Sequence, residues 1–141
     1  MTIMKNEKIA IIYKTVYGST EKYARWLNEA VKSDVFEMDS MNVNLLKSYD
    51  ALVVMSGTYA GKMPLTGFLK KNWELVKNKK IIMVAVGAAP QDNWWSKVTY
   101  FFVPGFIKNK VKYFKIYGKF KDKGEDVKRD NLKEIIEYIK R

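Results

Sequence analysis

The sequence contains no cysteine and no histidine. The absence of cysteine excludes disulfide bonds and thiol nucleophiles. The absence of histidine removes the commonest metal ligand and the side chain that most often serves as a general base near neutral pH. Any catalysis must therefore use carboxylates, hydroxyls, lysines or a bound cofactor, and we assign no catalytic side chain and no metal ligand.

Long hydrophobic segments are missing as well. The uncharged stretch VTYFFVPGFI (98–107) is well short of the ~18 residues that a membrane-spanning helix needs. The first residues, MTIMKNEKIAIIYK (1–14), place charges before and inside a short apolar run, which is not the pattern of a secretory signal. The length of 141 residues suits one domain with its own core. We therefore expect a single cytoplasmic domain over 1–141.

Acidic residues are scarce relative to basic ones in the second half of the chain. The formal net charge is +11; residues 1–61 sum to zero, residues 62–80 to +5, residues 81–96 to −1 and residues 97–141 to +7. A basic surface attracts anionic lipid, acidic proteins or nucleic acid. A lysine-rich surface without any partner is an equally simple interpretation.

Short apolar runs alternate with helical patterns along the chain. Strands are predicted at 8–14, 34–39, 49–57, 80–88 and 111–120, the second of them weak and typical of a sheet edge. Helices are predicted after the first strand, at 65–78, in part of 90–110 and at 130–141. Buried strands that alternate with helices indicate an α/β fold, a three-layer doubly wound domain with a five-stranded parallel sheet.

Three loops, 15–20, 57–63 and 87–95, follow the carboxyl ends of strands, where doubly wound sheets bind ligands. The first loop has four hydroxyl side chains around Gly18 and leads into a helix N-terminus, which favours an anion. We interpret it as a phosphate-binding loop. The alternative is that Ser19 or Thr20 only caps the helix. Neither the P-loop motif nor the dinucleotide fingerprint is present.

The first loop, TVYGST (15–20), resembles the T-x-T-G-x-T phosphate loop of the flavodoxins, which bind FMN. The agreement in strand and helix order extends from residue 8 to 141. The resemblance implies a flavodoxin-like fold with strand order 2-1-3-4-5 and FMN as the cofactor. It also implies that the phosphate end of FMN is bound by Thr15, Val16, Tyr17, Gly18, Ser19 and Thr20.

The other two loops would surround the flavin ring. TYAG (58–61) resembles the flavodoxin stretch T-W-G-D, which implies that Tyr59 stacks on the isoalloxazine ring. Backbone groups facing the ring would come from Gly57, Thr58, Ala60 and Gly61. The third loop, GAAPQDNWW (87–95), matches less closely and would contribute Gly87, Ala88, Ala89 and either Trp94 or Trp95. Packing of the tryptophans beneath segment 90–110 is the alternative.

The sequence departs from typical flavodoxins in two respects. Gly61 stands where an aspartate is common, and the second half is basic, so we expect the fully reduced flavin to form at a higher potential than in acidic flavodoxins. The aromatic segment 90–110 is more similar to the flavodoxin-domain subfamily that contains the quinone-dependent protoporphyrinogen oxidase. This segment would rest on an anionic membrane surface, or its aromatic residues would form a helix face on the sheet: Tyr100, Phe101, Phe102 and Phe106.

The resemblance implies an FMN-binding electron-transfer protein, because the flavin itself performs the redox chemistry. The alternative is an FMN-dependent oxidoreductase of the protoporphyrinogen-oxidase type, which works at the inner membrane face or on an anionic substrate. We expect an acidic redox partner protein, with peripheral contact to an anionic membrane as a second partner. No motif supports nucleic-acid binding. Receiver and low-molecular-weight phosphatase roles are disfavoured, because the required aspartate and loop cysteine are absent.

Overall fold

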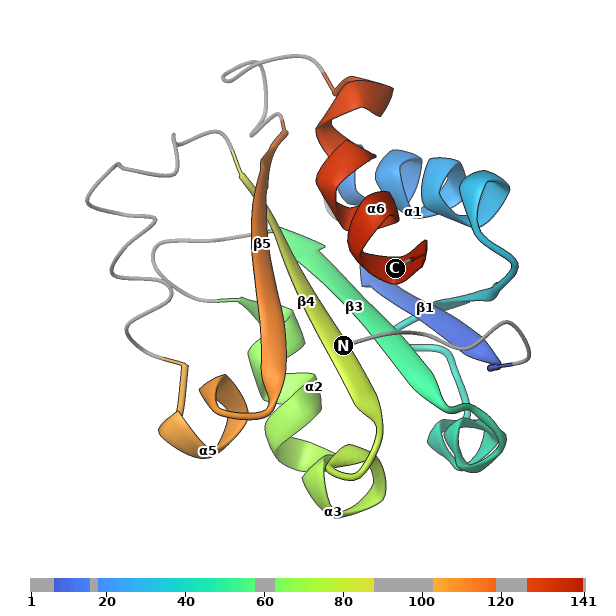
Figure 1. Cartoon of the computed structure of the whole chain (residues 1–141). Helices are drawn as coiled ribbons and strands as arrows, with labels where there is room; N and C mark the ends of the chain where they lie inside the picture. The colour runs from blue at the N-terminus through green and yellow to red at the C-terminus, as the bar shows by residue number, and fades with distance from the viewer. Residues whose placement is uncertain (1–6, 16–17, 58–62, 88–102, 119–126, 141) are drawn as a thin grey trace.

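The computed structural model describes residues 7–15, 18–57, 63–87, 103–118 and 127–140. The strands are β1 (Ile9–Lys14), β2 (Asp34–Glu37), β3 (Ala51–Gly57), β4 (Lys80–Gly87) and β5 (Val111–Tyr117) (Figure 1). The α-helices in these ranges are α1 (Ser19–Ala30), α2 (Pro64–Lys71), α3 (Trp73–Val76), α5 (Gly105–Lys108) and α6 (Lys133–Lys140). Two 3-10 helices complete the described elements, η1 (Val43–Ser48) and η2 (Arg129–Leu132).

The strands form one parallel sheet in the order β2-β1-β3-β4-β5. The predicted sheet and its order are confirmed, and the weakly patterned second strand lies at an edge. Every residue of β3 is buried, as is every residue of β4 after the first. Central parallel strands have this composition because helices cover both of their faces.

The helices pack against both faces of the sheet and create two hydrophobic cores (Figure 1). Ile11 and Val53 point to the face covered by α1 and α6. Ile12 and Val54 point to the opposite face, covered by α2, α5 and η1. Successive side chains of a strand alternate between faces, so each central strand stabilises both cores, at about 1.5–3 kcal/mol per large apolar side chain. The three predicted layers are confirmed.

The helix expected over 65–78 is interrupted. Between α2 and α3, Asn72 has a non-helical backbone, with φ −109° and ψ 16°. Its side-chain Nδ2 donates a hydrogen bond to the carbonyl of Phe68 at 2.9 Å. Asparagine disfavours helix interiors because its amide competes for backbone partners in this way. The apolar face is nevertheless kept, with Leu65, Leu69 and Val76 fully buried.

The segment before β5 also differs from the expectation that its aromatic residues form a helix face on the sheet. Pro104 is the N-cap of α5, so the Pro-Gly pair begins a helix here. Phe106 is 50% exposed, and its ring contacts the edge of Trp73 with the ring centroids 5.3 Å apart. The prediction that Phe106 packs on the sheet is therefore wrong; Ile107, the next residue, fills that place. The other aromatic residues of that prediction lie outside the described residues: Tyr100, Phe101 and Phe102.

Candidate functional site at the carboxyl edge of the sheet

The carboxyl edge of the sheet, where β1, β3, β4 and β5 end, brings the three predicted loops together. β1 ends at Lys14, beside Ser56 of β3, and Gly57 at the end of β3 pairs with Val86 of β4. The strand order reverses between β1 and β3, the position at which doubly wound sheets form a ligand crevice. Loops 15–20, 57–63 and 87–95 therefore begin side by side.

The first loop turns into α1 at Gly18. Gly18 has φ 90° and ψ −17°, a left-handed conformation that suits glycine. Its N–H donates to the Thr15 hydroxyl at 3.0 Å, so Thr15 closes the turn. Gly18 is the N-cap, and as a glycine it has no side chain that could cap the helix. The alternative that Ser19 or Thr20 caps α1 is therefore wrong, because both residues lie inside its first turn.

The first turn of α1 has the properties of an anion site. The leading N–H groups of a helix lack partners within the helix and lie at the positive end of its dipole. Thr20 lies in this first turn and is only 3% exposed. Its hydroxyl can donate a hydrogen bond, so it adds a neutral donor beside the N–H groups.

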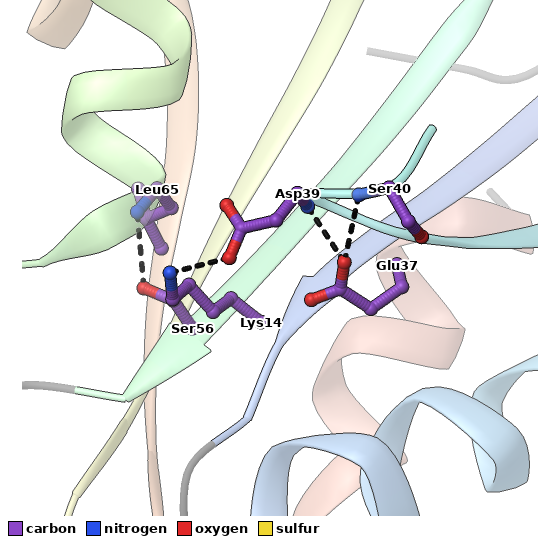
Figure 2. Close-up of polar contacts among 6 residues, drawn as sticks. All are labelled: Lys14, Glu37, Asp39, Ser40, Ser56 and Leu65. Atoms are coloured by element: carbon purple, nitrogen blue, oxygen red, sulfur yellow. Dashed lines mark hydrogen bonds and ion pairs between the residues drawn. The ribbon is translucent and has the colours of Figure 1, made fainter. Parts of the chain in front are cut away.

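The lysines beside the first loop contact other side chains. Lys14 Nζ lies 2.5 Å from Asp39 Oδ2 (Figure 2). Lys22 Nζ lies 5.1 Å from the centre of the Trp26 ring, within the range of a cation–π interaction. Both lysines therefore have contacts within the protein, and the groups that the first turn itself offers to an anion are backbone N–H groups and hydroxyls.

The turn after β2 fixes the partner of Lys14. Glu37 Oε1 accepts hydrogen bonds from the N–H groups of Asp39 at 2.7 Å and Ser40 at 2.9 Å (Figure 2). This turn holds the Asp39 carboxylate toward the end of β1. The ion pair neutralises Lys14, and the Glu37 carboxylate, which accepts from the two N–H groups, adds one negative charge to the described part of this corner. The sequence gives no signal for the pair, because its members are 25 residues apart.

The second loop is closed at its base by Ser56, a fully buried polar residue of β3. The Ser56 hydroxyl accepts the N–H of Leu65 at 3.1 Å (Figure 2). It also donates to the carbonyl of Gly57 at 3.1 Å. Leu65 belongs to the first turn of α2, so the hydroxyl connects the strand before the loop with the helix after it. Its signal in the sequence is a single small polar residue within an apolar strand, and we did not predict this role from it.

The third loop begins at Gly87, which pairs with Tyr117 at the end of β5. The N–H of Gly118 donates to the carbonyl of Gly87 at 3.1 Å. Gly118 is also close to Ser19 of α1. The residue that follows β5 therefore lies between the end of β4 and the first turn of α1, a juxtaposition that sequence reasoning missed.

The structure places part of the predicted site at the carboxyl edge. The predicted residues that it brings there are Thr15, Gly18, Ser19, Thr20, Gly57 and Gly87. The remaining predicted residues lie outside the described residues: Val16, Tyr17, Thr58, Tyr59, Ala60, Gly61, Ala88, Ala89, Trp94 and Trp95. Within the described ranges, no three histidine, cysteine or acidic residues form a metal site. No helix in the same ranges combines the length and apolar character needed to cross a membrane.

Comparison with known proteins identifies related sequences and folds. A family model described as a flavodoxin domain matches residues 10–123. An uncharacterized protein of Methanocaldococcus jannaschii is 27% identical over 84 residues, which are 59% of this chain and 56% of that protein. The chain thus aligns with little more than half of that relative's length.

Solved structures that share the fold include two flavoproteins of bacteria. Oxidised Flavodoxin 2 from Bacillus cereus has a TM-score of 0.66 and 18% identity, covering 93% of this chain and 96% of that one. A flavoprotein from Lactobacillus acidophilus, solved in complex with FMN, has a TM-score of 0.58 and 13% identity, covering 94% and 98%. At these identities the likeness establishes the common architecture.

Proposed function

The chain belongs to the flavodoxin domain family, and from this premise we propose that it binds FMN at the carboxyl edge and transfers electrons. The observation that carries the proposal is the first turn of α1, whose N-cap is a left-handed glycine and therefore has no side chain of its own to cap the helix. The FMN-bound flavoprotein of the same fold adds support. The fold holds this turn at the reversal of strand order, the usual ligand position.

The described residues suit the phosphate group of FMN. A phosphate has several acceptor oxygens, and the first turn of α1 offers N–H groups together with the hydroxyl of Thr20. Thr15 already accepts one hydrogen bond from Gly18 but keeps its own hydrogen to donate. Each hydrogen bond to a charged group contributes about 1.5–3 kcal/mol. Several such bonds hold a dianion without a dedicated arginine.

The protein's own contribution to the reaction is binding and orientation. When bound, FMN supplies one- and two-electron redox chemistry. The first turn of α1 would anchor the phosphate, and the base of the second loop, fixed by Ser56 and Leu65, would orient the chain that faces the flavin ring. The ring contacts that we assign to Tyr59 and Trp94 follow from the resemblance alone.

The first test is titration of the apoprotein with FMN and with riboflavin, which lacks the phosphate, followed by quenching of flavin fluorescence. We expect FMN to bind at least about a hundredfold more tightly than riboflavin, because ~3 kcal/mol of phosphate contacts corresponds to this ratio. Replacement of Thr20 by Val keeps the shape of the side chain, so it should weaken FMN binding and leave riboflavin binding unchanged. Equal affinity for both flavins would contradict the phosphate site.

Stepwise photoreduction of the FMN complex distinguishes a carrier from a two-electron enzyme. An electron carrier should accumulate a one-electron-reduced flavin with a characteristic visible spectrum. Direct conversion to the fully reduced flavin would favour the oxidoreductase alternative.

We also propose that the fully reduced flavin forms at a higher potential than in acidic flavodoxins, because Gly61 places no carboxylate beside the ring. A potential as low as theirs would refute this statement.

The second candidate is an FMN-dependent oxidoreductase that works at the inner face of an anionic membrane. One observation favours it: Phe106 on α5 is half exposed at the amino edge of the sheet, the edge where the strands begin. Described lysines at or near this edge include Lys8, Lys108 and Lys110, together with Lys77 and Lys80, which pair with Glu74 and Glu7, and Lys79, which donates to the carbonyl of Tyr49. An exposed aromatic ring among lysines suits an anionic bilayer surface. Lysine-rich surfaces also suit an acidic redox partner in the cytoplasm.

Vesicle co-sedimentation tests the membrane candidate. Vesicles of phosphatidylcholine with and without phosphatidylserine are compared at low and physiological salt. Replacement of Phe106 by Ser should reduce binding to anionic vesicles several-fold, since roughly 1–2 kcal/mol of apolar burial is lost. Replacement of Leu45 by Ser tests how far this surface extends, because Leu45 is 48% exposed and lies on η1, which packs beside α3 at the same edge. If the wild-type chain does not bind anionic vesicles, the membrane candidate is refuted and the carrier function is the remaining proposal.

A further inference from the structure

Gly118, the residue after β5, lies against the first turn of α1. A Cβ atom added to Gly118 would lie 3.1 Å from Ser19 Cβ and 3.5 Å from Ser19 Oγ, and it would overlap Val86 Cγ1. Gly118 is buried. Its backbone is not in the left-handed region, which among the described glycines is reached by Gly18. Lack of space, rather than backbone conformation, therefore requires glycine at this position.

A second contact joins the same helix to the end of β5. Tyr23 is fully buried, and its hydroxyl donates to the carbonyl of Tyr117 at 2.5 Å. The same hydroxyl accepts a hydrogen bond from Asn131 Nδ2 at 2.6 Å. Ser19 and Tyr23 are four residues apart, so both lie on one face of α1. This face rests on the end of β5 at two successive turns.

Gly118 also contacts the start of the third loop. Its N–H donates to the carbonyl of Gly87 at 3.1 Å. Since Gly87 ends β4 and Ser19 begins α1, Gly118 touches two of the three loop origins of the site. By contrast, a Cβ added to Gly18, Gly67 or Gly105 would meet no atom within 4 Å.

We propose that Gly118 is a positioning residue of the FMN site, which fixes the first turn of α1 and thereby the place of the phosphate. This inference rests on the proposed function. A Cβ at Gly118 would push Ser19 away by a few tenths of an ångström, and hydrogen bonds weaken as their distance and angle depart from the optimum. The N–H groups that follow Ser19 would then fit the phosphate less well. Binding of the flavin ring would change little, because the contacts that we propose for the ring come from the other two loops.

The experiment compares Gly118→Ala with Gly67→Ala. Gly67 lies on α2, and its added Cβ meets no atom within 4 Å, so this control isolates the change from glycine to alanine. The dissociation constants of FMN and riboflavin are measured for both variants. For Gly118→Ala we expect roughly tenfold weaker FMN binding and nearly unchanged riboflavin binding, so the ratio of the two affinities falls. Gly67→Ala should keep the wild-type ratio.

Two further variants identify the contact responsible. In a Ser19→Gly background, which removes the Cβ that would be crowded, Gly118→Ala should have no additional effect on the FMN-to-riboflavin ratio. If Gly118→Ala alone does not fold, Gly118→Ala with Val86→Ala relieves the overlap with Val86 and retains the crowding of Ser19. Urea unfolding of each apoprotein verifies that the variants compared are folded.

The outcomes separate the two proposals. A wild-type chain that does not discriminate FMN from riboflavin would overturn the proposed function and this inference together. A wild-type chain that discriminates, with an unchanged ratio in Gly118→Ala, would overturn the inference alone. An equal loss of affinity for FMN and for riboflavin in Gly118→Ala would also overturn the inference, because that result indicates a general packing role.

Discussion

Replacement of Lys115 by Met should make the protein more stable at neutral pH. Lys115 lies in β5 and is only 7% exposed. Desolvation by burial lowers the pKa of Lys115 from 10.5 to about 8. This gap corresponds to roughly 3 kcal/mol at 1.36 kcal/mol per pKa unit. Since local relaxation and water penetration reduce such penalties, we expect a gain of about 2 kcal/mol for the methionine variant at about pH 7.

The sign of the pH dependence follows from proton linkage. The unfolded chain keeps the Lys115 proton up to a pH near 10.5, whereas the folded chain releases it near pH 8. Between these values the unfolded state binds more protons, so the free energy of unfolding rises with pH. Below about pH 8 the folded chain bears the full cost of a charged, buried Lys115. As the pH rises above this value, Lys115 loses its proton and the cost decreases. The advantage of Lys115→Met should therefore shrink toward zero between about pH 8 and about pH 10.5.

Urea unfolding at several pH values measures this difference. Lys110→Met is the matched control, because Lys110 is exposed and immediately precedes β5; it should change stability by less than about 0.5 kcal/mol. Subtraction of the wild-type curve removes the titration of the other lysines. A methionine variant that is less stable at neutral pH, or whose advantage persists above pH ~10.5, would refute the reasoning.

Further stability predictions follow from single contacts. Gly18→Ala should cost about 1 kcal/mol in urea unfolding, because φ is 90° and the added Cβ meets no atom; Gly105→Ala, also in open space, should cost less. Desolvation and the hydrogen bond to Asp34 raise the pKa of Tyr49 to about 12, so a spectroscopic titration should detect late ionisation. Between pH 10 and about 12 this shift makes stability fall with pH, and Tyr49→Phe should remove that fall. Tyr23→Phe loses two hydrogen bonds and should destabilise by about 1–3 kcal/mol.

The sheet could be predicted because its signals are local. Runs such as IAIIYK and ALVVMSG are apolar throughout and short, which distinguishes buried parallel strands from helices of ten or more residues. Their alternation with helical patterns leaves few possible topologies. The interruption at Asn72 was missed because one asparagine is a weak signal within an otherwise regular apolar face.

The buried lysine of β5 illustrates a signal that a sequence contains but that is easily overlooked. In VKYFKIY, Lys112 and Lys115 are three residues apart, so in a strand they point to opposite faces. When helices cover both faces, one of two such lysines must be buried. Lys112 is exposed and Lys115 is buried. The spacing therefore predicts a desolvated lysine as soon as a two-sided sheet is assumed.

The candidate site was predictable only in part, since its loops carry local motifs and its supports are long-range. The hydroxyls around Gly18 stand out in the sequence, whereas Gly118 lies 99 residues after Ser19 along the chain. A glycine that is needed for space has no local signature, unlike one that is needed for a positive φ. Only the packing of the end of β5 on α1 distinguishes the two.

The net charge of +11 is a poor guide to the flavin potential, because the charge is unevenly placed. At the carboxyl edge, Lys14 is paired with Asp39, and Glu37 lies in the adjoining turn. The lysines of the amino edge lie across strands of six to eight residues, a span of roughly 20 Å. Physiological salt screens exposed charges over ~8 Å. We therefore propose that these lysines govern which partner or surface is bound, and that the potential of a bound flavin depends on groups beside the ring. The resemblance implies that Gly61, where an aspartate is common, is one such position.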